Sequence, residues 1–142
     1  MSTIEGIFAT LNKAKVKYVL IGGLASILHG VPRTTIDIDI AVEPKKKNLE
    51  ALIHALCKVG LVPETDRIDE ILGQGGVTFI NDRTVDVLTS TKGLEFSDIW
   101  KKKERVKYKG VFIPTISKKA QIMMLKAVGR EEDLRDVDFL TN

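Results

Sequence analysis

The sequence predicts an α/β (α+β) fold, in which a mixed, antiparallel-containing sheet is flanked by helices. Two observations point to this class. About five short β-rich segments are interspersed with segments of helical periodicity, and four of the β-rich segments lie close enough in pairs to form hairpins. The 142 residues are 44% hydrophobic and 29% charged, an ordinary globular composition. We therefore expect residues 1–142 to form a single domain, with C-terminal helices at about 117–140.

The N-terminal half is expected to place two strands between helices. A capping-box pattern at residues 2–5 and apolar residues at helical spacing predict a first helix that extends to about Lys15. The next expected elements are a buried strand at 16–21, a short helix at 24–29, a strand at 35–42 and a helix from about Pro44 to a stop at Gly60.

The C-terminal half is expected to contain two hairpins and two helices. Residues 63–76 are ambiguous between a short helix and a flexible, glycine-rich turn. The expected elements are a hairpin of 77–80 with 84–89, a hairpin over 106–113 that bends at Lys109-Gly110, a helix from Ser117 through Ala127 and a last helix at about 130–140.

The bulk composition restricts the classes of partner. With 22 basic and 19 acidic residues the net charge is only +3, which permits a phosphate-bearing ligand without demanding nucleic acid. The single cysteine, Cys57, excludes an intrachain disulfide, and we expect it on a buried helix face. The chain begins without a signal-peptide pattern, and no apolar run approaches the length of a membrane span. A cytoplasmic protein without membrane contact is expected.

Two carboxylates on one strand are the first sign of chemistry. In the predicted strand at 35–42, isoleucines at 36, 38 and 40 form one face, and Asp37 and Asp39 lie on the other, about 7 Å apart. Carboxylates so placed repel each other, and a fold tolerates the pair best with a cation between them. Such oxygen ligands suit Mg²⁺ or Mn²⁺.

A third carboxylate, Asp86, lies on another predicted apolar strand. If that strand pairs beside the strand of Asp37 and Asp39, the three aspartates form a cluster that could hold two metal ions. One ion would bridge triphosphate oxygens, and the other would lower the pKa of an attacking hydroxyl.

A phosphate-binding turn is predicted just upstream of these aspartates. Gly22-Gly23 lies between a strand and a short helix, where a backbone without side chains can approach phosphate and the helix N-terminus offers free N–H groups. Arg33 and Thr34 follow the short helix and could contact phosphate oxygens, Arg33 through its fork of donors. A glycine pair or an aspartate pair by itself is commonly structural, but the combination of the two in this order indicates a nucleotide site.

These residues resemble the motifs of the DNA polymerase beta-like nucleotidyltransferase superfamily. The matching segments are Leu20-Ile-Gly-Gly, Arg33-x-Thr, Asp37-Ile-Asp-Ile and a third aspartate, Asp86, on a later strand. The C-terminal stretch is similar to that of the short AbiEii-type, minimal nucleotidyltransferases. There Lys126, Arg130, Asp133 and Asp136 match, whereas Glu132 stands where lysine is common.

The resemblance implies a nucleotidyltransferase fold and transfer of a nucleoside monophosphate from a nucleoside triphosphate to a hydroxyl. It implies that Asp37, Asp39 and Asp86 are catalytic and bind Mg²⁺ (or Mn²⁺), with Asp86 assisting the acceptor. It further implies that the chain binds a nucleoside triphosphate, with ATP among the candidates. The residues expected to contact this nucleotide are Gly22, Gly23, Arg33, Thr34 and Lys126. Asp133 and Asp136 are expected to be structural or salt-bridged.

The sequence leaves the acceptor open. RNA such as tRNA, a protein and a small molecule such as an aminoglycoside are all compatible with the motifs. So is a role in a toxin–antitoxin system with a cognate toxin or antitoxin partner. The short chain suggests that a partner protein or a homodimer could complete the acceptor site. The alternative is a noncatalytic nucleotide-binding or antitoxin-like regulatory module, which the complete carboxylate set disfavours. A haloacid-dehalogenase-type phosphatase also uses Asp-x-Asp, but the supporting loops are lacking.

Several other conspicuous residues are interpreted as structural. His29 is expected to cap or pack a helix end, and His54 to be exposed. The basic runs at 45–47 and 101–103 are expected to be solvated, although the second run could contact an RNA or acidic acceptor together with the basic residues at 105–109. Phe96 and Trp100 fit a small hydrophobic cluster better than a base-stacking platform.

Overall fold

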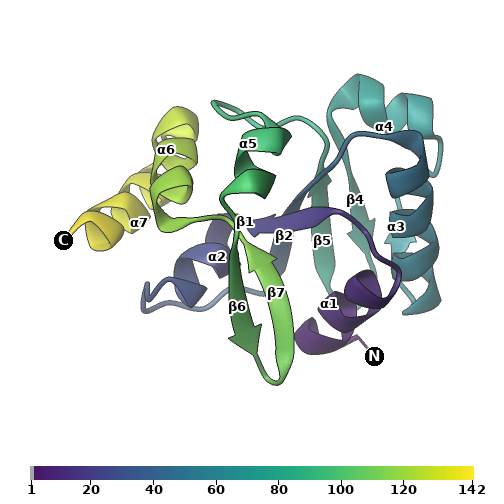
Figure 1. Ribbon diagram of the computed structural model, residues 1–142, viewed down its shortest axis with the longest axis horizontal. Coiled ribbons are helices and arrows are strands. Elements are labelled where there is room, and N and C mark those ends of the chain that lie inside the picture. Colours follow the sequence, from purple (N-terminus) through teal and green to yellow (C-terminus); the bar gives the residue numbers. More distant parts are fainter. Residues whose placement is uncertain (1) are drawn as a thin grey trace.

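The protein is a seven-stranded sheet flanked by helices in the computed structural model, which describes residues 2–142 (Figure 1). The strands are β1 (Tyr18–Ile21), β2 (Asp37–Val42), β3 (Val62–Pro63), β4 (Gly76–Ile80), β5 (Thr84–Leu88), β6 (Glu104–Tyr108) and β7 (Val111–Thr115). The helices are α1 (Ile4–Lys13), α2 (Gly22–Leu28), α3 (Lys46–Lys58), α4 (Ile68–Gln74), α5 (Phe96–Lys101), α6 (Lys118–Val128) and α7 (Glu131–Thr141).

The sheet is mixed, as the sequence predicts, with the order β3-β4-β5-β2-β1-β7-β6. The pairs β2–β5 and β1–β7 are parallel, and the other neighbours are antiparallel. Both predicted hairpins are present as β4–β5 and β6–β7. The two single strands and two hairpins expected from the sequence account for β1, β2 and β4–β7, and residues 62–63 add a two-residue edge strand, so the sheet has seven strands instead of about five.

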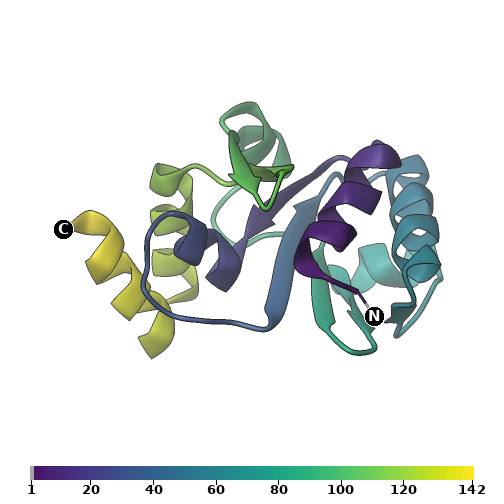
Figure 2. The same ribbon diagram turned by 90° about the horizontal axis from the view of Figure 1, so that it is seen from below.

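The helices gather at the two ends of the molecule. Figures 1 and 2 place α6 and α7 at one end and α1, α3 and α4 at the other. Helix α2 packs against β1, β2 and α6, so it connects the middle of the sheet to the C-terminal helix pair. Strands β1 and β2 lie in the interior of the sheet, and β1 is buried along its whole length.

The core follows the predicted periodicities, with two exceptions. Ile38 and Ile40 are fully buried, but Ile36 is 78% exposed because it precedes β2 and lies outside the strand ladder. Cys57 is exposed, contrary to expectation, because the buried stripe of α3 passes through the preceding residue, Leu56, and turns Cys57 to solvent. His54 is exposed, as expected.

The N-terminal cap also differs from the predicted capping box. Thr3 is the N-cap of α1, and its hydroxyl accepts a hydrogen bond from the backbone N–H of Gly6. Ser2 instead donates through its backbone N–H and its hydroxyl to the carboxylate of Asp82, at 2.9 and 2.8 Å. At the other end of the chain, the predicted cap Ser117 is confirmed, since its hydroxyl accepts from the N–H of Ala120.

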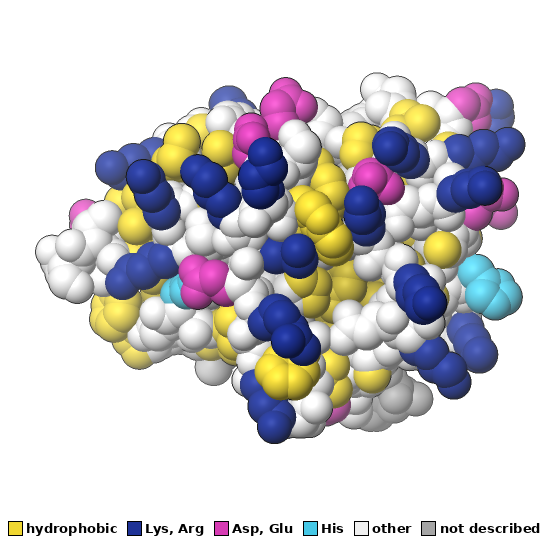
Figure 3. Space-filling view, in the orientation of Figure 1, with side chains coloured by type: hydrophobic (Ala, Val, Ile, Leu, Met, Phe, Trp, Pro, Cys, Tyr) yellow, Lys and Arg dark blue, Asp and Glu magenta, His cyan; other side chains and the backbone are white. Residues whose placement is uncertain are grey.

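The surface carries basic groups on much of one face. In Figure 3 lysine and arginine side chains are distributed around a hollow with apolar side chains at its centre. Within residues 2–142, no helix combines the length and the hydropathy that crossing a membrane requires.

Candidate active site

Three aspartates meet where β2 and β5 run side by side in the middle of the sheet. Asp39 and Asp86 are register partners in this parallel pair. Asp37 lies two residues before Asp39, and alternate residues of a strand share a face, so all three carboxylates belong to the same side of the sheet. The expectation that the strand of Asp86 pairs beside the strand of the other two is confirmed.

A cleft of about 270 Å³ opens over these aspartates between β1, β2 and the C-terminal helices. Most of the residues singled out from the sequence line it: Gly22, Gly23, Arg33, Asp37, Asp39 and Asp86. Two are not part of it. Thr34 and Lys126 are exposed and do not line the cleft, whereas Thr35, the neighbour of Thr34, does. The nucleotide contacts expected of Thr34 and Lys126 are therefore not supported by this geometry.

Gly22 is required by the shape of the cleft. It begins α2 with φ +72°, in the left-handed region that favours glycine, and a Cβ atom there would collide with Oδ2 of Asp39. The preceding N-cap, Ile21, makes no side-chain hydrogen bond to the helix start. The turn thus leaves the backbone N–H groups without a side-chain cap, close to the carboxylates.

The electrostatics of the cleft centre on Asp39. Burial raises the pKa of this carboxyl to about 7, and the negative charges of Asp86 and Asp37 and a hydrogen bond with Asp86 act in the same direction. The positive charge of Arg130 opposes the rise. The fold therefore holds neighbouring carboxylates together at an electrostatic cost, which is characteristic of functional sites.

Two arginines line the cleft, and both are held by buried acids of α7. Arg33 donates from Nε and Nη2 to the two carboxylate oxygens of Asp136, at 3.1 and 2.8 Å. Arg130 donates in the same manner to Asp133, at 2.8 and 3.1 Å. The structural, salt-bridged role expected for Asp133 and Asp136 is confirmed. The fork of Arg33, expected to face phosphate, is directed to Asp136 instead.

Arg130 is not among the site residues that the sequence motifs indicate, although it matches a C-terminal motif. The signal that could have found it is its position just before an acidic helix start, where Asp133 fixes it by a reciprocal capping box. Its backbone N–H also donates to Asp133, at 3.2 Å. Arg130 is thereby positioned at the rim of the cleft, close enough to Asp39 to affect its pKa.

The donor chemistry of the cleft fits a divalent cation. Five carboxylates and two guanidinium groups line it, so a triphosphate would meet net negative charge unless cations accompanied it. Asp37, Asp39 and Asp86 are the oxygen donors that Mg²⁺ or Mn²⁺ prefers. Among residues 2–142 no three acidic, histidine or cysteine side chains lie close enough together to hold a metal ion as they stand, so the fit depends on the chemistry of the donors alone.

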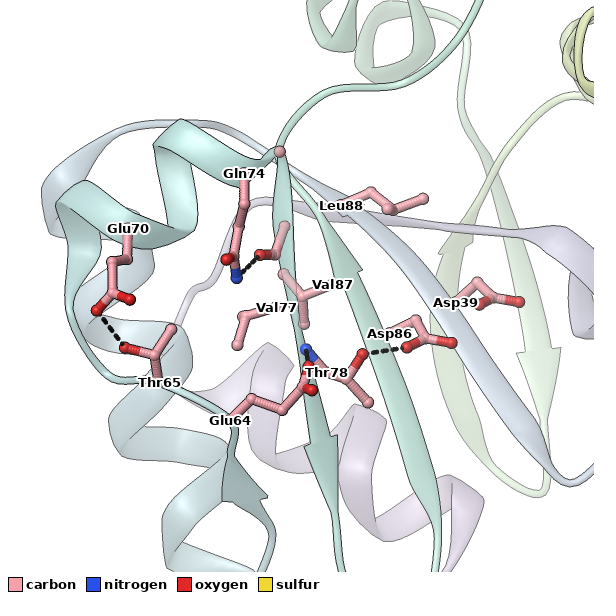
Figure 4. A pocket seen from close by; sticks show the side chains of 12 residues that line it. Asp39, Glu64, Thr65, Glu70, Gln74, Val77, Thr78, Asp86, Val87 and Leu88 are labelled. Carbon is pink, nitrogen blue, oxygen red and sulfur yellow. Dashed lines mark hydrogen bonds between the residues drawn. The ribbon is translucent and has the colours of Figure 1, made fainter.

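A second groove, of about 560 Å³, lies on the other side of the same aspartates (Figure 4). It shares Asp39 and Asp86 with the cleft and extends over β4 and β5 to α4. Thr78, the register partner of Asp86 on β4, donates its hydroxyl to Asp86 Oδ1 at 2.6 Å. The two hollows thus meet at one pair of carboxylates.

The second groove is acidic and polar. Glu64 and Glu70 line it together with Asp39 and Asp86, and in the part of the chain that the structure describes no lysine or arginine does so. The sequence does not reveal this groove, because its two glutamates come from residues 63–76, where no periodicity singles them out.

Comparison with known proteins agrees with this geometry. A family model described as aminoglycoside-2″-adenylyltransferase matches residues 3–140. The chain belongs to this family. It is a nucleotidyltransferase, as the aspartate and glycine motifs implied, but the AbiEii-type subtype expected from its C-terminal residues is corrected by the match.

Two solved structures show the same fold. The lincosamide antibiotic adenylyltransferase LnuA, bound to lincomycin, is 22% identical with a TM-score of 0.69, and the match covers 96% of this chain and 92% of that one. The antibiotic-resistance factor ANT(2″)-Ia is 14% identical with a TM-score of 0.67, and the match covers 94% of this chain and 78% of that one. No curated protein sequence matches this chain significantly.

Proposed function

We propose that this nucleotidyltransferase transfers AMP from ATP to a hydroxyl group of an amine-bearing small molecule. The observation that carries the proposal is the meeting of two hollows at the Asp39–Asp86 pair. The cleft is bounded by the glycine turn and by two arginines. The second groove has only acidic residues as its charged lining, among the residues that the structure describes. The first suits a metal-bound triphosphate, and the second suits a cationic acceptor.

Different residues of the cleft would bind the phosphates and the metal ion. Gly22 and Gly23 allow the backbone to approach the phosphates, and Asp37 and Asp39, with Asp86, would hold Mg²⁺ or Mn²⁺. The bound metal supplies neutralisation of the triphosphate and a lowered pKa for the attacking hydroxyl. AMP is the group proposed because members of the matched family are described as adenylyltransferases.

Asp86 is assigned to the acceptor side. It faces both hollows, and the hydroxyl of Thr78 fixes one of its oxygens, which leaves the other oxygen to orient an acceptor hydroxyl and receive its proton. The hydroxyl oxygen then forms the new bond to the α-phosphorus, and pyrophosphate leaves. Thr78 is a positioning residue, since it acts through Asp86.

The acidic groove favours an amine-bearing acceptor over RNA. Glu64 and Glu70 flank the polar residues Thr65 and Gln74, and a phosphate backbone would be repelled there. The matched family is named for aminoglycosides and one of the solved structures for lincosamide antibiotics, and such an acceptor carries both hydroxyl and amine groups. One chain forms the groove, so the proposal needs neither a homodimer nor a toxin or antitoxin partner.

The test is a transfer assay with defined acceptors. The purified protein is incubated with Mg²⁺ and each of the four nucleoside triphosphates, together with an aminoglycoside, a lincosamide, a neutral disaccharide or tRNA, and products are identified by mass spectrometry. We expect AMP on an amine-bearing small molecule, and no product with Asp86→Asn. The matched control Asp138→Asn, on the exposed side of α7, should retain activity.

The acceptor groove is tested separately. Glu64→Gln/Glu70→Gln should raise the KM for the amine-bearing acceptor by roughly 10-fold and leave the KM for ATP unchanged, because two charge contacts are lost on one side only. Glu50→Gln, on the exposed side of α3, is the control. Labelled tRNA without any small-molecule product would refute the acceptor class, and absence of metal-dependent ATP binding would refute the function.

A further inference from the structure

A third hollow lies away from the two that meet at the aspartates. It has a volume of about 760 Å³ and lies between α1, the start of β1, the end of α5 and the β6–β7 hairpin. It shares no residue with either hollow of the active site. Strand β6 is an edge of the sheet, so the hollow is open along that side.

Basic side chains surround an apolar floor in this hollow. The floor includes Trp100 and Phe112, and Lys15, Lys17, Lys103 and Arg105 supply the charge. Figure 3 shows this face, with apolar side chains in the central hollow and dark-blue side chains around it. Of the residues that the structure describes, no acid lines the hollow, although Glu43 pairs with Lys17 nearby at 3.4 Å.

The cations are stacked on the aromatic rings. The ammonium nitrogen of Lys103 lies 3.8 Å from the ring centroid of Trp100, and the guanidinium carbon of Arg105 lies 4.3 Å from the centroid of Phe112. Basic and aromatic residues therefore interleave in space, over α5 and the hairpin. The sequence had suggested no such interleaving, because the alternation appears only when α5 packs beside the β6–β7 hairpin.

We propose that this basic–aromatic groove binds single-stranded nucleic acid. Phosphates would pair with the lysines and Arg105 at the rim, and unpaired bases would stack on the guanidinium plane of Arg105 or take the place of the cations on the rings of Phe112 and Trp100. A duplex offers phosphates but keeps its bases stacked away from an apolar floor. An acidic peptide would satisfy the charges but would leave the exposed part of Phe112, a side chain that is 44% accessible, uncovered.

Tryptophan fluorescence can measure this binding without a label on the protein. Trp100 is its single tryptophan, so its fluorescence monitors the groove directly. A fluorescein-labelled 12-nucleotide oligo(U) RNA should bind with saturable quenching of tryptophan fluorescence, and the affinity should fall steeply as salt is raised. Oligo(dT) should behave similarly, whereas a 12-base-pair duplex and polyglutamate of equal charge should leave the tryptophan signal unchanged.

Matched variants separate charge from stacking. Lys103→Gln/Arg105→Gln should weaken oligo(U) binding by roughly 10-fold, whereas Lys46→Gln/Lys47→Gln, with the same loss of charge on α3, should change it by less than about 2-fold. Phe112→Leu should weaken oligo(U) by roughly 5-fold or more, without altering its salt dependence. Circular dichroism melting verifies that each variant is folded.

Three results would overturn the proposal. The first is equal weakening by the two double variants, which would indicate binding to overall charge. The second is quenching by polyglutamate as strong as that by oligo(U), which would indicate an acidic protein partner. The third is no binding of oligo(U) at low salt by the folded protein. Transfer activity toward small acceptors is measured in parallel and should be unchanged in all of these variants, because no groove residue lines the active site.

Discussion

Replacement of Asp39 by asparagine should stabilise the metal-free protein while it abolishes nucleotidyl transfer. In the wild-type protein this carboxylate is partly buried between the charges of Asp86 and Asp37. Asparagine has nearly the same shape and carries no charge, so the substitution removes the repulsion and leaves the packing intact. A residue with a merely structural role would give the opposite sign, because its loss would destabilise the fold.

The size of the effect follows from the pKa of Asp39, which rises from 3.8 to about 7. A carboxyl whose pKa is raised on folding lowers the free energy of unfolding only where it loses its proton. The stability that the protonated Asp39 allows is therefore fully present below pH 3.8 and is lost as the pH rises through about 7. At about 1.4 kcal/mol for each pKa unit, the loss is at most about 4 kcal/mol. Since Asp39 and Asp86 titrate together, we expect Asp39→Asn to gain about 1–3 kcal/mol at pH 8.5 and little at pH 4.5.

Urea unfolding in the presence of EDTA, at both pH values, measures this difference. Asp138→Asn makes the same chemical change on an exposed position of α7 and should shift the midpoint at neither pH. Saturating Mg²⁺ and ATP should stabilise the wild-type protein and have little effect on Asp39→Asn. A stabilisation that is equal at pH 4.5 and 8.5, or a destabilisation at pH 8.5, would refute the assigned electrostatic cost.

Three further substitutions test the supports of the site. Gly22→Ala should lower the free energy of unfolding by about 1–3 kcal/mol and weaken metal-dependent ATP binding in calorimetry, because the new Cβ collides with Asp39 and the residue is strained at a positive φ. Gly110→Ala is the control for the strain alone, since Gly110 has φ +83° and open space around it. Asp136→Ala should cost about 2–3 kcal/mol in urea unfolding, since it removes the bidentate partner of Arg33; an unchanged midpoint would contradict this. Thr78→Val should lower kcat roughly 3- to 10-fold with an unchanged KM for ATP, whereas a change confined to that KM would exclude the positioning role.

The centre of the site could be predicted because its residues lie on strands with strong local patterns. Apolar residues alternate with Asp37 and Asp39 in β2 and flank Asp86 in β5, and this alternation fixes which side each carboxylate occupies. The local pattern leaves open whether the two strands are neighbours. The structure pairs them as Asp39 with Asp86.

The surroundings of the site could not be predicted, because they depend on contacts between distant residues. Arg33 was expected to face phosphate, but its partner Asp136 lies 103 residues away. Lys126 was placed in the site from a motif, yet the orientation of α6 turns it to solvent. Glu64 and Glu70 come from a segment without periodicity, so only the packing of α4 beside β4 reveals them as part of a groove.

The strand order explains how one pair of carboxylates can serve two substrates. Strand β2 lies between β1 and β5, so Asp39 has Ile21, the residue before the glycine turn, as its partner on one side and Asp86 on the other. Asp86 in turn has Thr78 beyond it. The donor and acceptor hollows are therefore successive positions along a single row across the sheet. A slip of one residue between β2 and β5 would turn one carboxylate to the opposite face and break the row, so strand register is the feature on which the chemistry depends.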